Sequence, residues 1–128
     1  MTDIVKQINL EESTHPSIFI VTKNSLVALE ILQKALNSLK HKKGLYLQAN
    51  NFNINSRKEE YLSYDILFID KIEFLKANEE EEFLSLLEEL RREGKTVVFA
   101  ATTEPQKLNM FSESLRNILG FGLVISIS

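Results

Sequence analysis

The sequence predicts an α/β fold, a three-layer αβα sandwich built on a five-stranded, mostly parallel sheet. Five short apolar runs rich in β-branched residues recur along the chain, as expected for strands buried on both faces. Helical or polar segments separate these runs, which is the alternation of parallel strands joined by crossovers. The length of 128 residues suits one core of this kind and not two.

The first half of the chain supplies an arm, a strand and a helix. Residues 1–16 show no sustained period and end in Thr14-His15-Pro16, so we expect an N-terminal arm before a domain spanning 17–128. Residues 17–22 form the first predicted strand. A helix follows from Asn24-Ser25, because leucines recur at three-to-four-residue spacing as far as Leu39 and a cationic, glycine-ended segment closes it.

The middle of the chain predicts a second and a third strand, at residues 45–48 and 65–70. The polar connection between them, residues 50–61, is expected to hold about one helical turn.

The remaining elements follow the same alternation. A helix is expected to be capped by Asn78 and to carry an apolar stripe from Phe83 to Leu90, with glutamates in its first turn. Residues 96–101 then form a strand, residues 113–119 a short helix, and residues 122–127 the last strand.

Composition limits the classes of function. Hydrophobic residues make up 44% and charged residues 26% of the chain, the balance of a folded soluble protein, and no apolar run approaches the roughly 20 residues that span a bilayer. The N-terminus does not resemble a signal peptide, so we expect a cytoplasmic protein with no membrane association. Without cysteine and with two histidines, the chain offers little for metal or thiol chemistry. The net charge of −3 argues against strong nucleic-acid binding and favours a protein partner.

Four segments, taken in order, resemble the DnaA family of AAA+ proteins, which have a P-loop NTPase fold. Asp65-Ile66-Leu67-Phe68-Ile69-Asp70-Lys71-Ile72-Glu73-Phe74-Leu75 looks like the Walker B region of that family. Residues 89–101 resemble its sensor-1 strand, and residues 114–123 its R-L-x-S-R-F-x-W-G-L segment. Residues 19–33 align without a gap onto F-I-Y-G-G-V-G-L-G-K-T-H-L-L-Q. The resemblance spans roughly residues 17–127 and implies a role in DNA replication.

The phosphate-binding loop of the family is altered in this chain. Such a loop needs glycines whose amides wrap phosphates, a lysine for the terminal phosphates and a Ser or Thr for magnesium. The lysine position holds Ala28 and the threonine position Leu29. The degenerate Walker A segment consists of Thr22, Lys23, Asn24, Ser25, Leu26, Val27, Ala28 and Leu29.

Other positions that serve ATP in the family are substituted too. The Walker B aspartate survives as Asp70, but the following acidic residue is Lys71. The sensor-1 aspartate corresponds to Thr103, and the two arginines, one of them the arginine finger, correspond to Ser114 and Ile118, with Arg116 between them. The chain also stops where the family continues into a helical lid. We therefore expect no catalytic residue, no bound cofactor or metal, and no ATPase activity.

Two further surfaces bear on partners. The resemblance places DNA-contacting basic residues just after Walker B, where this chain has four glutamates, Glu79 to Glu82, which repel phosphate. In the arm, Gln7, Ile8 and Leu10 resemble the start of the clamp-binding motif of the DnaA homologue Hda, although Glu11 and Glu12 replace its apolar follower.

The sequence thus predicts a non-catalytic DnaA/Hda-like protein that acts by protein contact in replication initiation or its regulation, on the initiator, the sliding clamp or another replisome component. One alternative is an inactive AAA+-type structural subunit, as in a clamp loader. Another is a small enzyme with an unrelated site at the carboxyl ends of the strands, where Asp70, Thr102, Thr103 and Glu104 would gather.

Overall fold

The computed structural model describes residues 9–11 and 16–127. Their elements alternate between strands and helices. In chain order these are β1 (Ser17–Thr22), α2 (Ser25–Asn37), β2 (Gly44–Gln48), α3 (Ile54–Leu62), β3 (Ile66–Asp70), α4 (Glu80–Arg92), β4 (Thr96–Ala101), α5 (Glu113–Leu119) and β5 (Leu123–Ile127). Short 3-10 turns cover Ala49–Asn51, Ile72–Phe74, Ala77–Glu79 and Pro105–Lys107.

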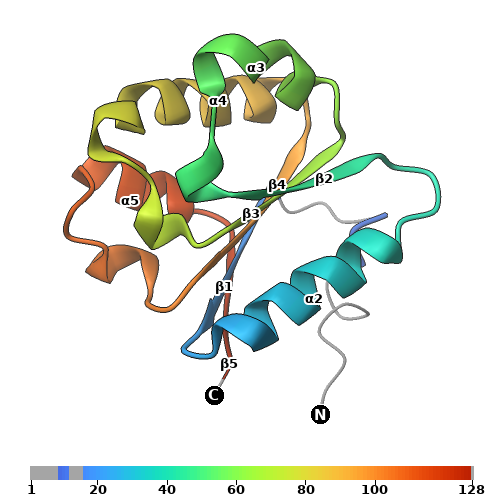
Figure 1. The fold of residues 1–128 in the computed structure, drawn as a ribbon, viewed down its shortest axis with the longest axis horizontal. Helices are drawn as coiled ribbons and strands as arrows, with labels where there is room; N and C mark the ends of the chain where they lie inside the picture. Colours follow the sequence, from blue (N-terminus) through green and yellow to red (C-terminus); the bar gives the residue numbers. More distant parts are fainter. Residues whose placement is uncertain (1–8, 12–15, 128) are drawn as a thin grey trace.

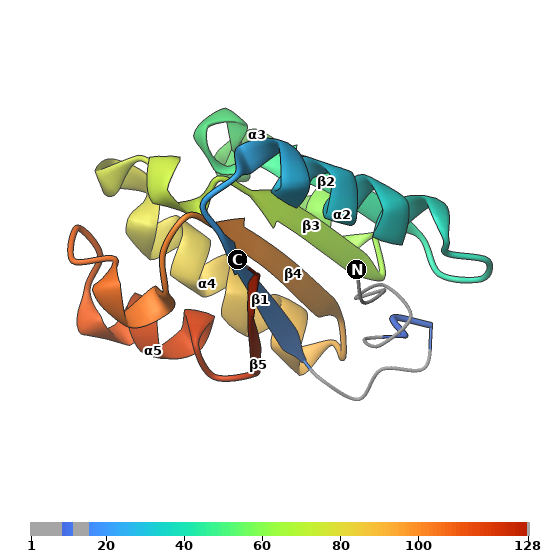
Figure 2. The same cartoon turned by 90° about the horizontal axis from the view of Figure 1, so that it is seen from below.

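The five strands form one sheet in the order β2-β3-β4-β1-β5, and every neighbouring pair is parallel. Helix α2 covers one face of the sheet, and α3, α4 and α5 lie on the other (Figure 1). Figure 2 separates α2 from α4 and α5 most clearly, with the sheet between them. The predicted three-layer αβα sandwich is confirmed, and the sheet is wholly parallel.

Two apolar clusters fill the spaces on either side of the sheet. Successive residues of a strand point to opposite faces, so Phe19 packs with α3, α4 and α5, whereas its neighbours Ile18 and Ile20 pack with α2. Both faces of β3 and β4 are fully buried, which explains why these strands read as continuous apolar runs. The central strands therefore hold the residues at their carboxyl ends in fixed positions.

Helix α3 is longer than the sequence indicated. It runs for nine residues, where about one turn was expected. Only Ile54 and Tyr61 are buried in it, so its apolar period is too sparse to stand out. The Tyr61 ring packs edge-on against Phe52 at 5.2 Å between centroids, and Phe52 packs the same way on Phe83 of α4 at 5.3 Å. Tertiary packing on α4, rather than local pattern, stabilises this helix.

The expected cap at Asn78 is wrong. Asn78 lies inside a 3-10 turn, and α4 begins at Glu80 after Glu79, whose side chain makes no capping bond. Three glutamates occupy the first turn of α4, where the positive end of the helix dipole favours them. The charge of these residues replaces the side-chain cap.

The described part of the arm is fastened to the domain. Leu10 is only 4% exposed and belongs to the cluster beneath α2. The Glu11 carboxylate accepts hydrogen bonds from the backbone amides of Lys40 and His41, and these bonds lower its pKa. Gln7 and Ile8 lie outside the described residues. Within the described ranges, no helix is both long and apolar enough to cross a bilayer.

Candidate functional site

The carboxyl ends of β1, β3 and β4 meet at one edge of the sheet. The helix that follows β1, α2, lies on one face of the sheet, whereas the helix that follows its neighbour β4, α5, lies on the other, so the two connections leave adjacent strands in opposite directions. Open α/β sheets bind ligands at such a switch point, outside the carboxyl ends of the strands. We call this region the carboxyl edge.

The turn from β1 to α2 is short, and its own side chains accept hydrogen bonds from its backbone amides. The Asn24 Oδ1 atom accepts hydrogen bonds from the amides of Leu26 at 3.0 Å and Val27 at 3.3 Å, and the Asn24 amide donates to Thr22 Oγ1. These are the amides that a helix N-terminus would otherwise offer to an anion. Asn24 thus occupies the anion-binding position with a neutral amide oxygen.

Helix α2 extends into the segment predicted to be a degenerate phosphate loop. It begins at Ser25, so Ser25, Leu26, Val27, Ala28 and Leu29 are all helical. Ala28 is buried against the sheet, while Leu26 is 74% exposed to solvent. Of the eight predicted residues, Thr22, Lys23 and Asn24 alone lie outside the helix, and Thr22 closes β1.

Asp70 ends β3 and is 2% exposed. Its Oδ2 atom accepts a hydrogen bond of 2.7 Å from the hydroxyl of Tyr46 on the neighbouring strand β2, and its Oδ1 accepts one of 2.9 Å from the amide of Lys71. Burial, and secondarily the bond to Asp70, raises the pKa of Tyr46 to about 12. The carboxylate is therefore engaged on both oxygens by the protein itself.

The segment after β3 is tied to the end of β4. Lys71 adopts a left-handed backbone conformation with φ of 56°, which turns the chain sharply out of the strand. Glu73 Oε2 then accepts hydrogen bonds from both the amide and the hydroxyl of Thr102, at 2.8 and 2.6 Å. Its Oε1 is buried without a hydrogen bond to the described residues. This contact links the positions that follow the predicted Walker B and sensor-1 strands.

The other residues that the sequence analysis singled out do not come together as a catalytic site. Ser114 is exposed on α5, Ile118 packs against the core, and the Arg116 guanidinium donates to the backbone oxygen of Gln106 at 3.3 Å. Glu104 pairs with Lys107, at 3.9 Å. Across residues 9–11 and 16–127, no three His, Cys, Asp or Glu side chains gather as a metal site.

Tyr46 and Glu73 are the two residues of the carboxyl edge that sequence reasoning missed. Gln48 is the register partner of Asp70, so Tyr46, two residues earlier on β2, shares the face of the sheet towards which Asp70 points. The register of β2 against β3 is what places Tyr46 there, and no pattern in the sequence gives that register. The bond from Glu73 to Thr102 joins residues 29 apart, and no local pattern marks it.

The parallel sheet, the crossover helix directly after β1 and the buried aspartate at the end of β3 define a P-loop-type α/β domain of the AAA+ class. Residues 22–126 match the bacterial DnaA ATPase domain family, and the chain belongs to that family. The chromosomal replication initiator DnaA of Anaplasma marginale is 31% identical over 106 residues, which cover 73% of this chain.

Solved structures agree with the family assignment. AMPPCP-bound DnaA from Aquifex aeolicus has a TM-score of 0.87 and 26% identity, covering 98% of this chain and 45% of that one. A replication initiator DnaA bound to AMPPCP and single-stranded DNA has the same TM-score at 27% identity, covering 98% and 44%. The chain spans 22% of the length of the Anaplasma protein, so the match concerns one domain of a longer relative.

Proposed function

We propose that this chain is a nucleotide-independent DnaA-family domain that acts by protein contact in the initiation of DNA replication or in its regulation. Family membership supports the replication setting. The hydrogen bonds within the carboxyl edge support independence from nucleotide. The chain works as a rigid recognition body and not as an ATPase.

One observation carries the proposal: the protein's own hydrogen bonds occupy the groups that a nucleotide would need. Asn24 takes the first free amides of α2, and Tyr46 takes the Asp70 oxygen that faces the neighbouring strand. The site lacks the lysine that neutralises phosphate, because the matching position is the buried Ala28. An incoming triphosphate would have to break three hydrogen bonds without gaining a lysine contact.

Weak binding of single-stranded DNA belongs to the same proposal. One solved relative is bound to single-stranded DNA, so the fold itself is compatible with this ligand. In this chain Glu80, Glu81 and Glu82 fill the first turn of α4, and their charge opposes a phosphate backbone there. We expect affinity for DNA well below that of the DNA-bound relative.

The function is tested by affinity capture from the host lysate with the tagged protein, in the presence and in the absence of ATP. We expect the replication initiator or the sliding clamp to be enriched equally in both conditions. Capture that requires ATP would refute nucleotide independence. Capture of neither protein would refute the role in replication. Capture of a complex with fixed stoichiometry would favour the alternative that the chain is a structural subunit.

The role of the arm needs a careful variant. Leu10 is buried in the domain, so Leu10→Ala would disturb the core as well as any clamp contact. Clamp binding through Leu10 would also require this side chain to leave the core. Gln7→Ala is the cleaner change, and selective loss of the clamp from its captured proteins is the result expected if the arm binds there.

A further inference from the structure

Strand β5 forms an open edge of the sheet. Among the described residues it pairs with β1 alone, so its other side carries backbone N–H and C=O groups that have no strand neighbour. Helix α2 packs mainly on β1, β2, β3 and β4, and β5 lies beyond them. No residue of β5 is buried, whereas β3 and β4 are buried throughout. The edge of β5 is therefore accessible from outside the domain.

The strand lacks the features that usually protect a sheet edge, which are lysine, proline and bulges. Residues 117–127 contain no charged residue and no proline. The register between β1 and β5 runs through five consecutive residue pairs, so no bulge twists the strand away. Apart from Ser126, the strand is apolar. These properties leave β5 ready to pair with a further strand.

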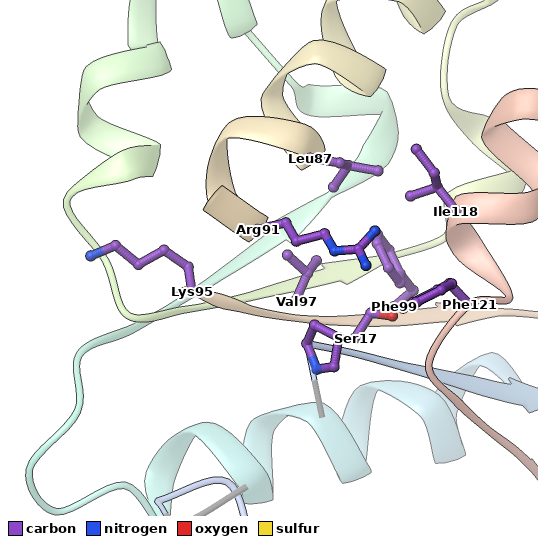
Figure 3. A pocket seen from close by; sticks show the side chains of 9 residues that line it. Ser17, Leu87, Arg91, Lys95, Val97, Phe99, Ile118 and Phe121 are labelled. Atoms are coloured by element: carbon purple, nitrogen blue, oxygen red, sulfur yellow. The ribbon is translucent and has the colours of Figure 1, made fainter. Parts of the chain in front are cut away.

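The amino end of β5 is held in place by its neighbours. An added Cβ on Gly122 would lie 2.0 Å from the carbonyl oxygen of Ser17, so the two backbones are in close contact there. The Arg91 guanidinium lies over the ring of Phe121, at 4.3 Å from its centroid (Figure 3). An edge that is already ordered loses little conformational freedom when it pairs with another strand.

The side chains of β5 are complementary to a second copy of the same strand. In an antiparallel pair centred on Ile125, Leu123 of one copy faces Ile127 of the other, and Val124 faces Ser126. Directly opposed residues share one face of a sheet, so Leu123, Ile125 and Ile127 of both copies would form one apolar row on the α2 side. The uncharged strand offers an acidic or a basic segment no ion pair, whereas its own copy meets it without repulsion.

We infer that two copies of this chain dimerise by antiparallel pairing of β5 with β5, which joins their sheets into one continuous sheet. The two-fold axis is then perpendicular to the sheet. Both α2 helices lie on one face of the joined sheet, and α3, α4 and α5 of both copies lie on the other. The two carboxyl edges point in opposite directions. The pairing needs neither a nucleotide nor a replication protein, so it goes beyond the proposed function and does not depend on it.

Analytical ultracentrifugation of the full chain over a concentration series tests the pairing. The wild-type protein is expected to change from monomer to dimer as its concentration rises. The double variant Val124→Lys/Ser126→Lys places like charges opposite each other twice in every dimer and should weaken dimerisation about tenfold or more. Val124→Lys/Ser126→Glu is the matched control, because it sets opposite charges against each other at the same positions and should keep the dimer. Val124 is 40% exposed and Ser126 is exposed too, so both variants should fold.

A wild-type chain that stays monomeric throughout the series would overturn the inference and leave the edge of β5 to a strand of another protein. Equal dissociation constants for the two double variants would overturn it as well, since the dimer would then form through another surface or in another register. Neither result changes the capture of the initiator or the clamp, which tests the proposed function separately.

Discussion

The hydroxyl of Tyr46 donates a hydrogen bond to Asp70, the carboxylate that the sequence resemblance places in the Walker B position. The hydroxyl is 2.7 Å from a carboxylate that is almost completely buried. A buried acceptor that loses its partner incurs the full desolvation cost of the group, about 1–3 kcal/mol. The pair therefore stabilises the carboxyl edge mainly by keeping Asp70 satisfied.

Titration of Tyr46 checks this residue-scale argument. Its raised pKa of about 12 means that the folded protein holds the phenolic proton more tightly than the unfolded chain, whose value is 10.0. The associated stability is complete below about pH 10 and is lost as the pH rises towards 12. In Asp70→Asn the pKa should fall but stay above 10.0, because burial is the larger cause. NMR of labelled tyrosine carbons, assigned with Tyr46→Phe, gives the value, and an unchanged pKa in Asp70→Asn would contradict the contact.

At the scale of an element, α2 is helical in the segment that the sequence resemblance aligns with a phosphate-binding loop. The helix starts at Ser25 because Asn24 supplies the cap, and the residues after it have no glycine to keep the backbone open. Leu32 and Ala35 then bury the same face as Ala28, so the start of the helix is consistent with its packing. The change from loop to helix follows from capping and burial together.

Removing the cap should weaken α2 at its first turn. Asn24→Ala is expected to lower the free energy of unfolding by about 1 kcal/mol, because two amides lose their acceptor. Asn24→Ser keeps a side-chain oxygen at the same position and should lose only a small part of this stability. Chemical denaturation of the three proteins measures the difference, and equal losses in both variants would show that the cap bond contributes nothing.

At the scale of the whole molecule, the protein's own hydrogen bonds connect adjacent elements along the carboxyl edge. Asn24 links β1 to α2, Tyr46 links β2 to β3, and Glu73 links the segment after β3 to the end of β4. A ligand that binds only the folded state stabilises it by an amount that grows with the logarithm of the ligand concentration relative to its dissociation constant. Because internal bonds already occupy these groups, we expect a nucleotide to add little stability.

Thermal unfolding tests this expectation directly. The midpoint should stay unchanged when Mg²⁺ with AMPPCP, or single-stranded DNA, is added in excess. The Aquifex DnaA that is solved with AMPPCP, and the initiator solved with DNA, serve as positive controls. A ligand present at about 100 times its dissociation constant adds roughly 2.7 kcal/mol, so a binding event would shift the midpoint by several degrees.

The sequence predicted the elements whose local pattern agrees with their packing. Strand β1 and helix α5 have the predicted bounds, because a buried strand shows a continuous apolar run and Ser112 supplies a clear cap. Helix α3 was underestimated because its stability comes from Phe52 and Phe83 outside it. The substituted loop could be located by alignment, and the start of its helix by the leucine spacing that follows Asn24-Ser25, but the bonds from Tyr46 and Glu73 could not be predicted. Those depend on strand order, which no local pattern records.

The position of β1 between β4 and β5 has a consequence for the order in which the chain is folded during synthesis. Strand β1 has no sheet partner until residues 96–101 have been made, and its other neighbour, at residues 123–127, is made later still. The pair β2 and β3 can form earlier, since one short connection that contains α3 separates them. An apolar strand that waits this long for its neighbours is exposed to aggregation, and contacts so distant in sequence slow folding. A nascent chain that stalls before residue 96 should therefore depend most on chaperones.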